Sequence, residues 1–167
     1  MSDSSSICLS CGLCCDGTLI GHVQLGKEEL PTLKDLLEIE RTDESGFFLQ
    51  PCKSYCDGCT IYLNRPKQCA NFNCGLLKSV EQKEVAFTTA VDVINDVKLK
   101  KSAIEKKLNE FSFETQSQSF HFKMTELKNV LAKKKSESTL TQSHLELSAD
   151  LESLDKLLSQ KFGVSLF

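Results

Sequence analysis

The chain has 167 residues and a hydrophobic content of 40%, enough for one compact domain or for a small domain with a helical extension. Its net charge of −3 argues against general nucleic-acid binding, and no apolar run approaches the ~20 residues that a membrane span needs. The N-terminus lacks the basic and apolar regions of a signal peptide, so we expect a cytoplasmic protein with no membrane partner.

A dense cysteine run follows a polar N-terminal segment, residues 1–7, which we expect to be a frayed tail. The run contains Cys8, Cys11, Cys14 and Cys15. A two-residue gap lets two sulfurs turn toward one point, as in zinc knuckles and iron–sulfur ligand runs, and Gly12 suits such a tight turn. Because the side chains of adjacent residues diverge, Cys14 and Cys15 favour two metals, or one metal and a second role, over four thiols on one ion.

Short strands and one helix are predicted next. The expected strands are Thr18–Leu25, Gly46–Gln50 and Cys59–Tyr62, with a charged loop at Arg41–Ser45 and a hairpin loop at Pro51–Gly58. A helix should run from Lys27 to about Leu37, and Pro31 should lie in its first turn or divide it. This part of the chain is therefore expected to form a small module with little regular structure.

A second cysteine group lies in the same module, and no cysteine follows it. Its members are Cys52, Cys56, Cys59, Cys69 and Cys74. Nine cysteines is an odd number, and cytosolic thiols stay reduced, so metal ligation explains them better than a disulfide framework. Residues 1–75 also carry six basic and ten acidic side chains, so bound cations would offset the added charge of the thiolates.

The two groups together resemble the CxxCxxCC (YkgJ-type) family, which is described as zinc- or iron-chelating. The matching residues are Cys8, Cys11, Gly12, Cys14, Cys15, Pro51, Cys52, Cys59, Ile61, Tyr62, Arg65, Pro66, Cys69, Phe72 and Cys74. The resemblance implies that the eight cysteines of this pattern are metal ligands. Cys56 lies outside the pattern, and Ala70 stands where the family often has Arg.

The identity of the metal stays open between zinc, mononuclear iron and an iron–sulfur cluster. Cys8, Cys11 and Cys14 also match the first three ligands of a bacterial ferredoxin run, with Cys52 or Cys69 as a distant fourth. The alternative function is thus a [4Fe–4S] protein in a redox or protein-modification reaction. No catalytic constellation is visible, and His22 is expected to have a loop or surface role rather than to be a ligand.

The chain is expected to change character after its cysteine-cluster domain, residues 1–78. For residues 79–167 we predict a helical region that packs on this domain and could leave one face for a protein partner. A capping box at Ser79–Gln82 should open a helix whose apolar stripe includes Ile94, Val97, Ile104 and Leu108, and which either breaks near Lys98 and Lys101 or continues past them. Ser112–Ser119 is expected to be a loop, although the alternating phenylalanines beside it leave a short hairpin open.

Two more helices complete the prediction. One contains Met124, Leu127, Val130 and Leu131, and the other begins near Ser143, presents Leu147, Leu151, Leu154, Leu158 and Phe162, and ends at Gly163. His121 and His144 are expected to be solvated or packed residues. The predicted fold class is α+β and mostly helical, with a small cysteine-rich metal module followed by a C-terminal helical region.

Overall fold

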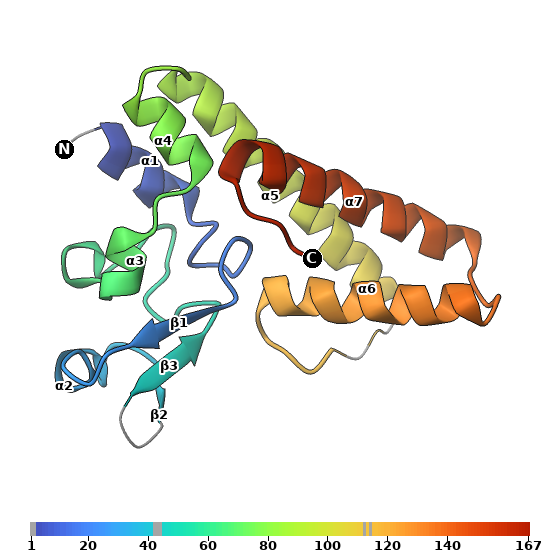
Figure 1. Cartoon of the computed structure of the whole chain (residues 1–167), viewed down its shortest axis with the longest axis horizontal. Coiled ribbons are helices and arrows are strands. Elements are labelled where there is room, and N and C mark those ends of the chain that lie inside the picture. The colour runs from blue at the N-terminus through green and yellow to red at the C-terminus, as the bar shows by residue number, and fades with distance from the viewer. Residues whose placement is uncertain (1–2, 42–44, 112, 114) are drawn as a thin grey trace.

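The computed structural model of the chain describes residues 3–41, 45–111, 113 and 115–167, and it has the predicted α+β, mostly helical fold (Figure 1). The helices are α1 (Asp3–Cys11), α2 (Leu30–Leu33), α3 (Lys67–Asn71), α4 (Gly75–Glu81), α5 (Phe87–Glu110), α6 (Phe120–Ser136) and α7 (Gln142–Phe162). The strands are β1 (His22–Leu25), β2 (Glu40–Arg41) and β3 (Gly46–Leu49), and a 3-10 helix, η1, spans Tyr62–Asn64. None of the helices described is both long and apolar enough to cross a membrane.

The prediction of a frayed tail at residues 1–7 is wrong for residues 3–7, which the structure describes. Residues 3–7 belong to α1, and Ile7 is only 3% exposed because it packs into the larger of two apolar cores. Helix α1 packs against α4 and α5. A tertiary contact therefore orders a segment whose polar composition gave no helical signal.

The strands form a three-stranded antiparallel sheet in the order β1-β3-β2, with Val23 opposite Phe48. The predicted strands Thr18–Leu25 and Gly46–Gln50 are confirmed as β1 and β3, although β1 begins only at His22 and β3 ends at Leu49. The predicted helix from Lys27 shrinks to the single turn α2, with Pro31 in its first turn. The smaller core lies here and consists of Val23, Leu25, Leu33, Leu37 and Phe48. Most of the predicted loop at Arg41–Ser45 falls on residues 42–44, which lie outside the described residues.

The third predicted strand, Cys59–Tyr62, does not form. Thr60 donates both its backbone N–H and its hydroxyl to the carbonyl of Ser54, so this segment folds back on its own loop rather than onto the sheet. Tyr55 and Cys59 make one isolated bridge, and η1 follows. The turn at Asp57-Gly58 is present, with positive φ at both residues, but it closes a loop and not a hairpin of the sheet.

Helices α4 and α5 replace the one helix predicted to open at Ser79. Cys74 is the N-cap of α4, and its sulfur accepts a hydrogen bond from the N–H of Leu77. The helix ends at Glu81, Lys83 takes a left-handed φ of 59°, and α5 begins at Phe87. Lys98 and Lys101 do not break α5, so the second of the two predicted alternatives holds.

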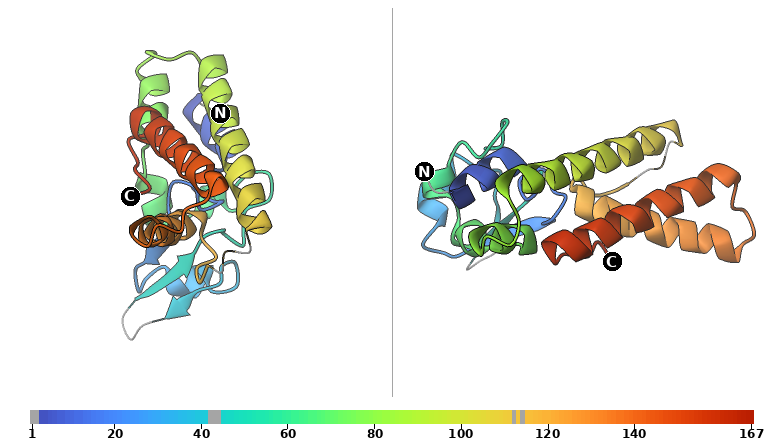
Figure 2. Two further views of the ribbon diagram at one scale, coloured as in Figure 1. Left: turned by 90° about the vertical axis from the view of Figure 1, so that its right-hand side faces the viewer. Right: turned by 90° about the horizontal axis from the view of Figure 1, so that it is seen from above.

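The C-terminal helices agree better with the sequence. Helices α6 and α7 occupy the predicted segments, Thr141 rather than Ser143 caps α7 in a capping box with His144, and Gly163 ends α7 in the left-handed conformation. The described residues of the Ser112–Ser119 segment contain no strand. Helix α7 packs along α5 and also contacts α4 and α6 (Figure 2).

The larger core joins the N-terminal helices to this bundle. It extends from Ile7 and Leu13 through Leu76 and Leu77 to the buried faces of α5, α6 and α7. Gly75 permits a close approach between α4 and the end of α7, because an added Cβ would lie 3.1 Å from the carbonyl oxygen of Lys161. The helical region therefore packs directly on the cysteine-bearing part of the chain.

Candidate metal centre

A cavity of about 240 Å³ is lined by residues of α1, β3, α3 and α4 and of the loops between them. Eight cysteines line it: Cys8, Cys11, Cys14, Cys15, Cys52, Cys59, Cys69 and Cys74. Much of the remaining wall is apolar and includes Leu13, Phe48 and Phe162. The cysteines that the family resemblance selected thus surround one space, whereas Cys56 is exposed and does not line it.

The first cysteine run reaches the cavity through a helix and a tight loop. Cys8 and Cys11 lie on α1, which ends where Gly12 adopts a φ of 71°. Gly12 also faces the ring of Tyr55, so that a Cβ at this position would collide with it. The loop then closes through a hydrogen bond from the N–H of Thr18 to the carbonyl of Leu13, 3.0 Å long, and carries Cys14 and Cys15.

The four cavity cysteines of the second group come from four different places in the fold. Cys52 follows β3, and its N–H donates to the carbonyl of Cys15 over 2.8 Å, which ties the two groups together. Cys59 lies in the loop before η1, Cys69 lies on α3, and Cys74 caps α4. Residues far apart in the chain are thereby held around the same space.

Burial controls the protonation of most of these thiols. It raises the pKa of Cys11 and of Cys69 to about 12, and it also raises the pKa of Cys8, Cys14, Cys52 and Cys74. Cys15 and Cys59 share a thiol hydrogen bond, which raises the pKa of Cys15 and lowers that of Cys59 to about 6. Metal binding would therefore have to displace several thiol protons.

The donor chemistry of the cavity suits a soft metal. Thiolate sulfur is the ligand that zinc, iron and iron–sulfur clusters share. Over residues 3–41, 45–111, 113 and 115–167, no three Cys, His, Asp or Glu side chains stand close enough together to hold an ion without moving. The thiols line a cavity rather than meet, so ligation requires their sulfurs to close inward to about 2.3 Å from zinc.

Two polar residues of the wall add to the site. Gln50 is 2% exposed, and its Oε1 has no hydrogen-bond partner among the described residues, so it offers a buried acceptor at the cavity. Arg65 lies with its guanidinium carbon 3.9 Å from the centre of the Tyr62 ring and donates from Nη1 to the Tyr62 carbonyl over 2.6 Å. The positive charge of Arg65 lowers the pKa of Cys8, Cys59 and Cys69, although burial outweighs it at Cys8 and Cys69.

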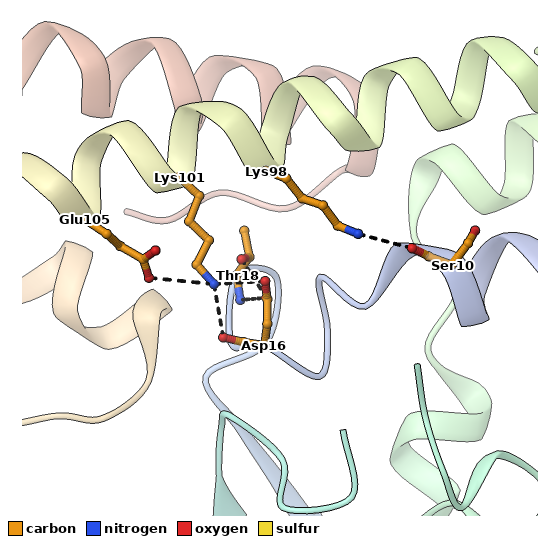
Figure 3. Close-up of polar contacts among 6 residues, drawn as sticks. All are labelled: Ser10, Asp16, Thr18, Lys98, Lys101 and Glu105. Carbon is orange, nitrogen blue, oxygen red and sulfur yellow. Dashed lines mark hydrogen bonds and ion pairs between the residues drawn. The ribbon is translucent and has the colours of Figure 1, made fainter. Parts of the chain in front are cut away.

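The sequence did not predict the contacts between α5 and the segment of the first cysteine run, residues 8–18. Asp16 accepts from the N–H and hydroxyl of Thr18 and forms an ion pair of 2.9 Å with Lys101 (Figure 3). Lys98 donates to the carbonyl of Ser10 over 3.2 Å (Figure 3). Because 85 residues separate Asp16 from Lys101, no local pattern could have paired them.

None of the histidines lines the cavity. His22 was expected in a loop or on the surface, but it lies on β1, half-buried, and its ring stacks on Phe122. His144 is buried in the cap of α7, and burial lowers the pKa of His121. Within the residues described, cysteine is therefore the donor type that dominates this site.

The Gly12→Ala variant is expected to weaken metal retention. A left-handed φ costs an alanine about 1–2 kcal/mol, and the new methyl group would also displace Tyr55 beside the cysteine loop. The matched control is Gly163→Ala, because Gly163 has a similar φ of 68° but nothing within 4 Å of an added Cβ. Thermal unfolding should show a loss of stability in both variants, larger in Gly12→Ala, and chelator competition should show a loss of metal only in Gly12→Ala. Equal metal retention would contradict the prediction.

Comparison with known proteins covers the same part of the chain. A family model named CxxCxxCC, described as "Putative zinc- or iron-chelating domain", matches residues 7–96. No curated protein and no solved structure shows significant similarity to the chain. The family match spans more than half of the 167 residues and contains all eight cysteines of the cavity. The chain therefore belongs to the CxxCxxCC family.

Proposed function

We propose that this protein binds zinc or iron through the thiolates of eight cysteines: Cys8, Cys11, Cys14, Cys15, Cys52, Cys59, Cys69 and Cys74. The observation that carries the proposal is that these residues, drawn from six parts of the fold, line one cavity. Buried inert cysteines would not need to gather in this way, because each could pack separately into an apolar core. Membership of a metal-chelating family supports the same conclusion.

Charge compensation supports a bound cation. Ionised thiolates around one cavity repel each other, and Glu81 adds a carboxylate to the wall. Arg65 is the one basic residue among the side chains that line the cavity in the described structure. A divalent metal ion would supply the positive charge that a single guanidinium cannot.

We further infer that the N-terminal and C-terminal parts of the chain have different roles. Residues 1–78 would form the metal-binding domain, and residues 79–167 would support it through the larger core. Leu99 on α5 and Leu145 on α7 are exposed, which is compatible with a protein partner on the helical region.

The choice of metal can be tested directly. Our primary expectation is zinc or mononuclear iron, with a [4Fe–4S] cluster in a redox or protein-modification reaction as the alternative. The protein should be purified without oxygen, and its metal content and visible spectrum recorded together. Zinc gives a colourless protein, whereas a cluster absorbs broadly and brings sulfide with the iron. Metal-free protein that takes up neither zinc nor iron would refute the proposal.

Cys59 is expected to matter more for metal binding than Cys56. Cys59 lines the cavity, whereas Cys56 is exposed and does not line it. Cys59→Ser should lower the amount of metal bound per chain, and Cys56→Ser is the matched control that should not. Elemental analysis of both purified variants decides the point. Equal losses would make Cys56 a ligand.

Arg65→Gln is expected to weaken metal retention about 10–100-fold. This is the usual effect of removing a residue that surrounds a metal site and interacts with its ligands. Arg65 lines the cavity and acts electrostatically on three of its thiols. The control is Lys67→Gln, which also removes a positive charge but from a side chain that is 67% exposed and paired with Glu28. Chelator competition should separate the two variants, while circular dichroism should show unchanged helical content. Equal retention would make Arg65 an ordinary surface residue.

A further inference from the structure

We propose that the cavity contains two separate four-thiol metal sites, each built from both cysteine groups of the sequence. The helix-side set is Cys8, Cys11, Cys14 and Cys74. The sheet-side set is Cys15, Cys52, Cys59 and Cys69. This inference rests on the proposed function, and it assigns each thiol to one of two ions.

The helix-side set is assembled by the packing of α1 on α4. Cys8 and Cys11 are three residues apart on α1 and so lie on the same face of that helix. Helix α4, which begins directly after Cys74, packs against α1. Cys14 follows in the loop, and all four members of the set pack against the larger core.

The sheet-side set is assembled around the smaller core. Cys52 and Cys69 both pack against this core, and α3, which carries Cys69, lies against β1. Cys15 is joined to the set through its carbonyl, which accepts from the N–H of Cys52 over 2.8 Å. Cys59 lines the cavity two residues before Ile61, which also packs against the smaller core.

The adjacent cysteines divide the cavity. Cys14 packs against the larger core, whereas the backbone of Cys15 bonds to that of Cys52, which packs against the smaller core. Successive side chains cannot easily converge on one ion, but they can serve two ions that lie on either side of the backbone. Cys14 and Cys15 can therefore each bind a different ion, whereas they could not easily bind the same one.

Two closed sites also account for the number of ligands. A tetrahedral thiolate site takes four sulfurs, and eight thiols fill two such sites without a bridging ligand. Each thiol that binds releases its proton to solvent as the sulfur–metal bond forms. Arg65 acts on thiols of both sets, on Cys8 in one and on Cys59 and Cys69 in the other, so its guanidinium lies where it can offset charge from both.

Paired substitutions can test the assignment in the full-length protein loaded with Zn²⁺. Native mass spectrometry should find two zinc ions per parent chain. The variant Cys8→Ser/Cys11→Ser changes only the helix-side set and should keep one zinc ion under chelator competition. The matched variant Cys8→Ser/Cys52→Ser removes the same number of thiols but damages both sets, so it should keep none.

A second measurement needs no substitution. Parent protein with less than saturating Zn²⁺ can be alkylated, digested and analysed by peptide mass spectrometry. Thiols of one set should become protected together, and the two sets should respond independently. One ion in the parent, protection that mixes the sets, or equal retention by the two double variants would overturn the two-site assignment while leaving metal binding intact. A parent chain that takes up no zinc or iron would instead overturn the proposed function.

Discussion

Removal of the metal is expected to unfold residues 1–75 while much of α5, α6 and α7 remains helical. Binding energies of structural zinc sites reach about 10–16 kcal/mol, which is comparable to the whole stability of a small domain. The cysteine-bearing part has only short strands and short helices. Apart from Ile7, Leu13 and Leu19, which enter the larger core, a five-residue core holds it together without metal. Far-UV circular dichroism with and without a strong chelator should record a partial loss of structure.

Hydrogen exchange can locate this loss. Amides of β1 and β3 should exchange faster in the metal-free protein, whereas those of the buried face of α7 should keep more of their protection. Readdition of Zn²⁺ is the control, and it should restore both the spectrum and the protection. An unchanged spectrum after confirmed loss of metal would contradict the expectation.

Lys101→Met is expected to destabilise the protein by about 3 kcal/mol, because removing one partner of a largely buried ion pair strands the other charge. The side chains of Lys101 and Asp16 are only 13% and 17% exposed, and Asp16 also orders the loop after Cys15 through Thr18. The substitution further removes a contact between the Lys101 ammonium and the Phe120 ring. The change in the free energy of unfolding can be measured with urea.

The matched control is Lys133→Met. Its ion pair with Glu137 is 4.0 Å long and well exposed, so its loss should change stability by less than about 1 kcal/mol. In the double variant Lys101→Met/Asp16→Asn, the total loss should be smaller than the sum of the two single losses, because the stranded charge is gone. Equal effects of Lys101→Met and Lys133→Met would show that the contact between α5 and the cysteine loop contributes little.

Periodic apolar positions made the long helices predictable. Ile94, Val97, Ile104 and Leu108 recur at helical spacing and lie on the buried face of α5, and the leucines of α7 behave in the same way. The positions of helix ends were less predictable. The predicted cap of this helix was Ser79, but the sulfur of Cys74 caps α4 five residues earlier, and Cys is not part of a capping pattern based on Ser or Thr.

Segments that depend on distant contacts could not be predicted. The polar N-terminal segment is helical because Ile7 enters a core that extends to Leu76 and Leu77 and to α5, α6 and α7, and Cys59–Tyr62 leaves the sheet because Thr60 bonds Ser54. The eight cysteines were identified from spacing and family resemblance, but spacing gave no indication that Cys74 lines the same cavity as Cys8. The proposed sharing of ligands between the two groups is a property of helix packing and not of any local motif.

Whether the eight cavity cysteines bind metal is tested most directly by a map of thiol protection at saturating metal. The protein is loaded with Zn²⁺ without oxygen, treated with an alkylating reagent, digested, and compared by peptide mass spectrometry with metal-free protein. Our account predicts that the eight cysteines lining the cavity are protected by metal and that Cys56 is alkylated in both states. Alkylation of those eight at the same rate with and without metal would contradict it.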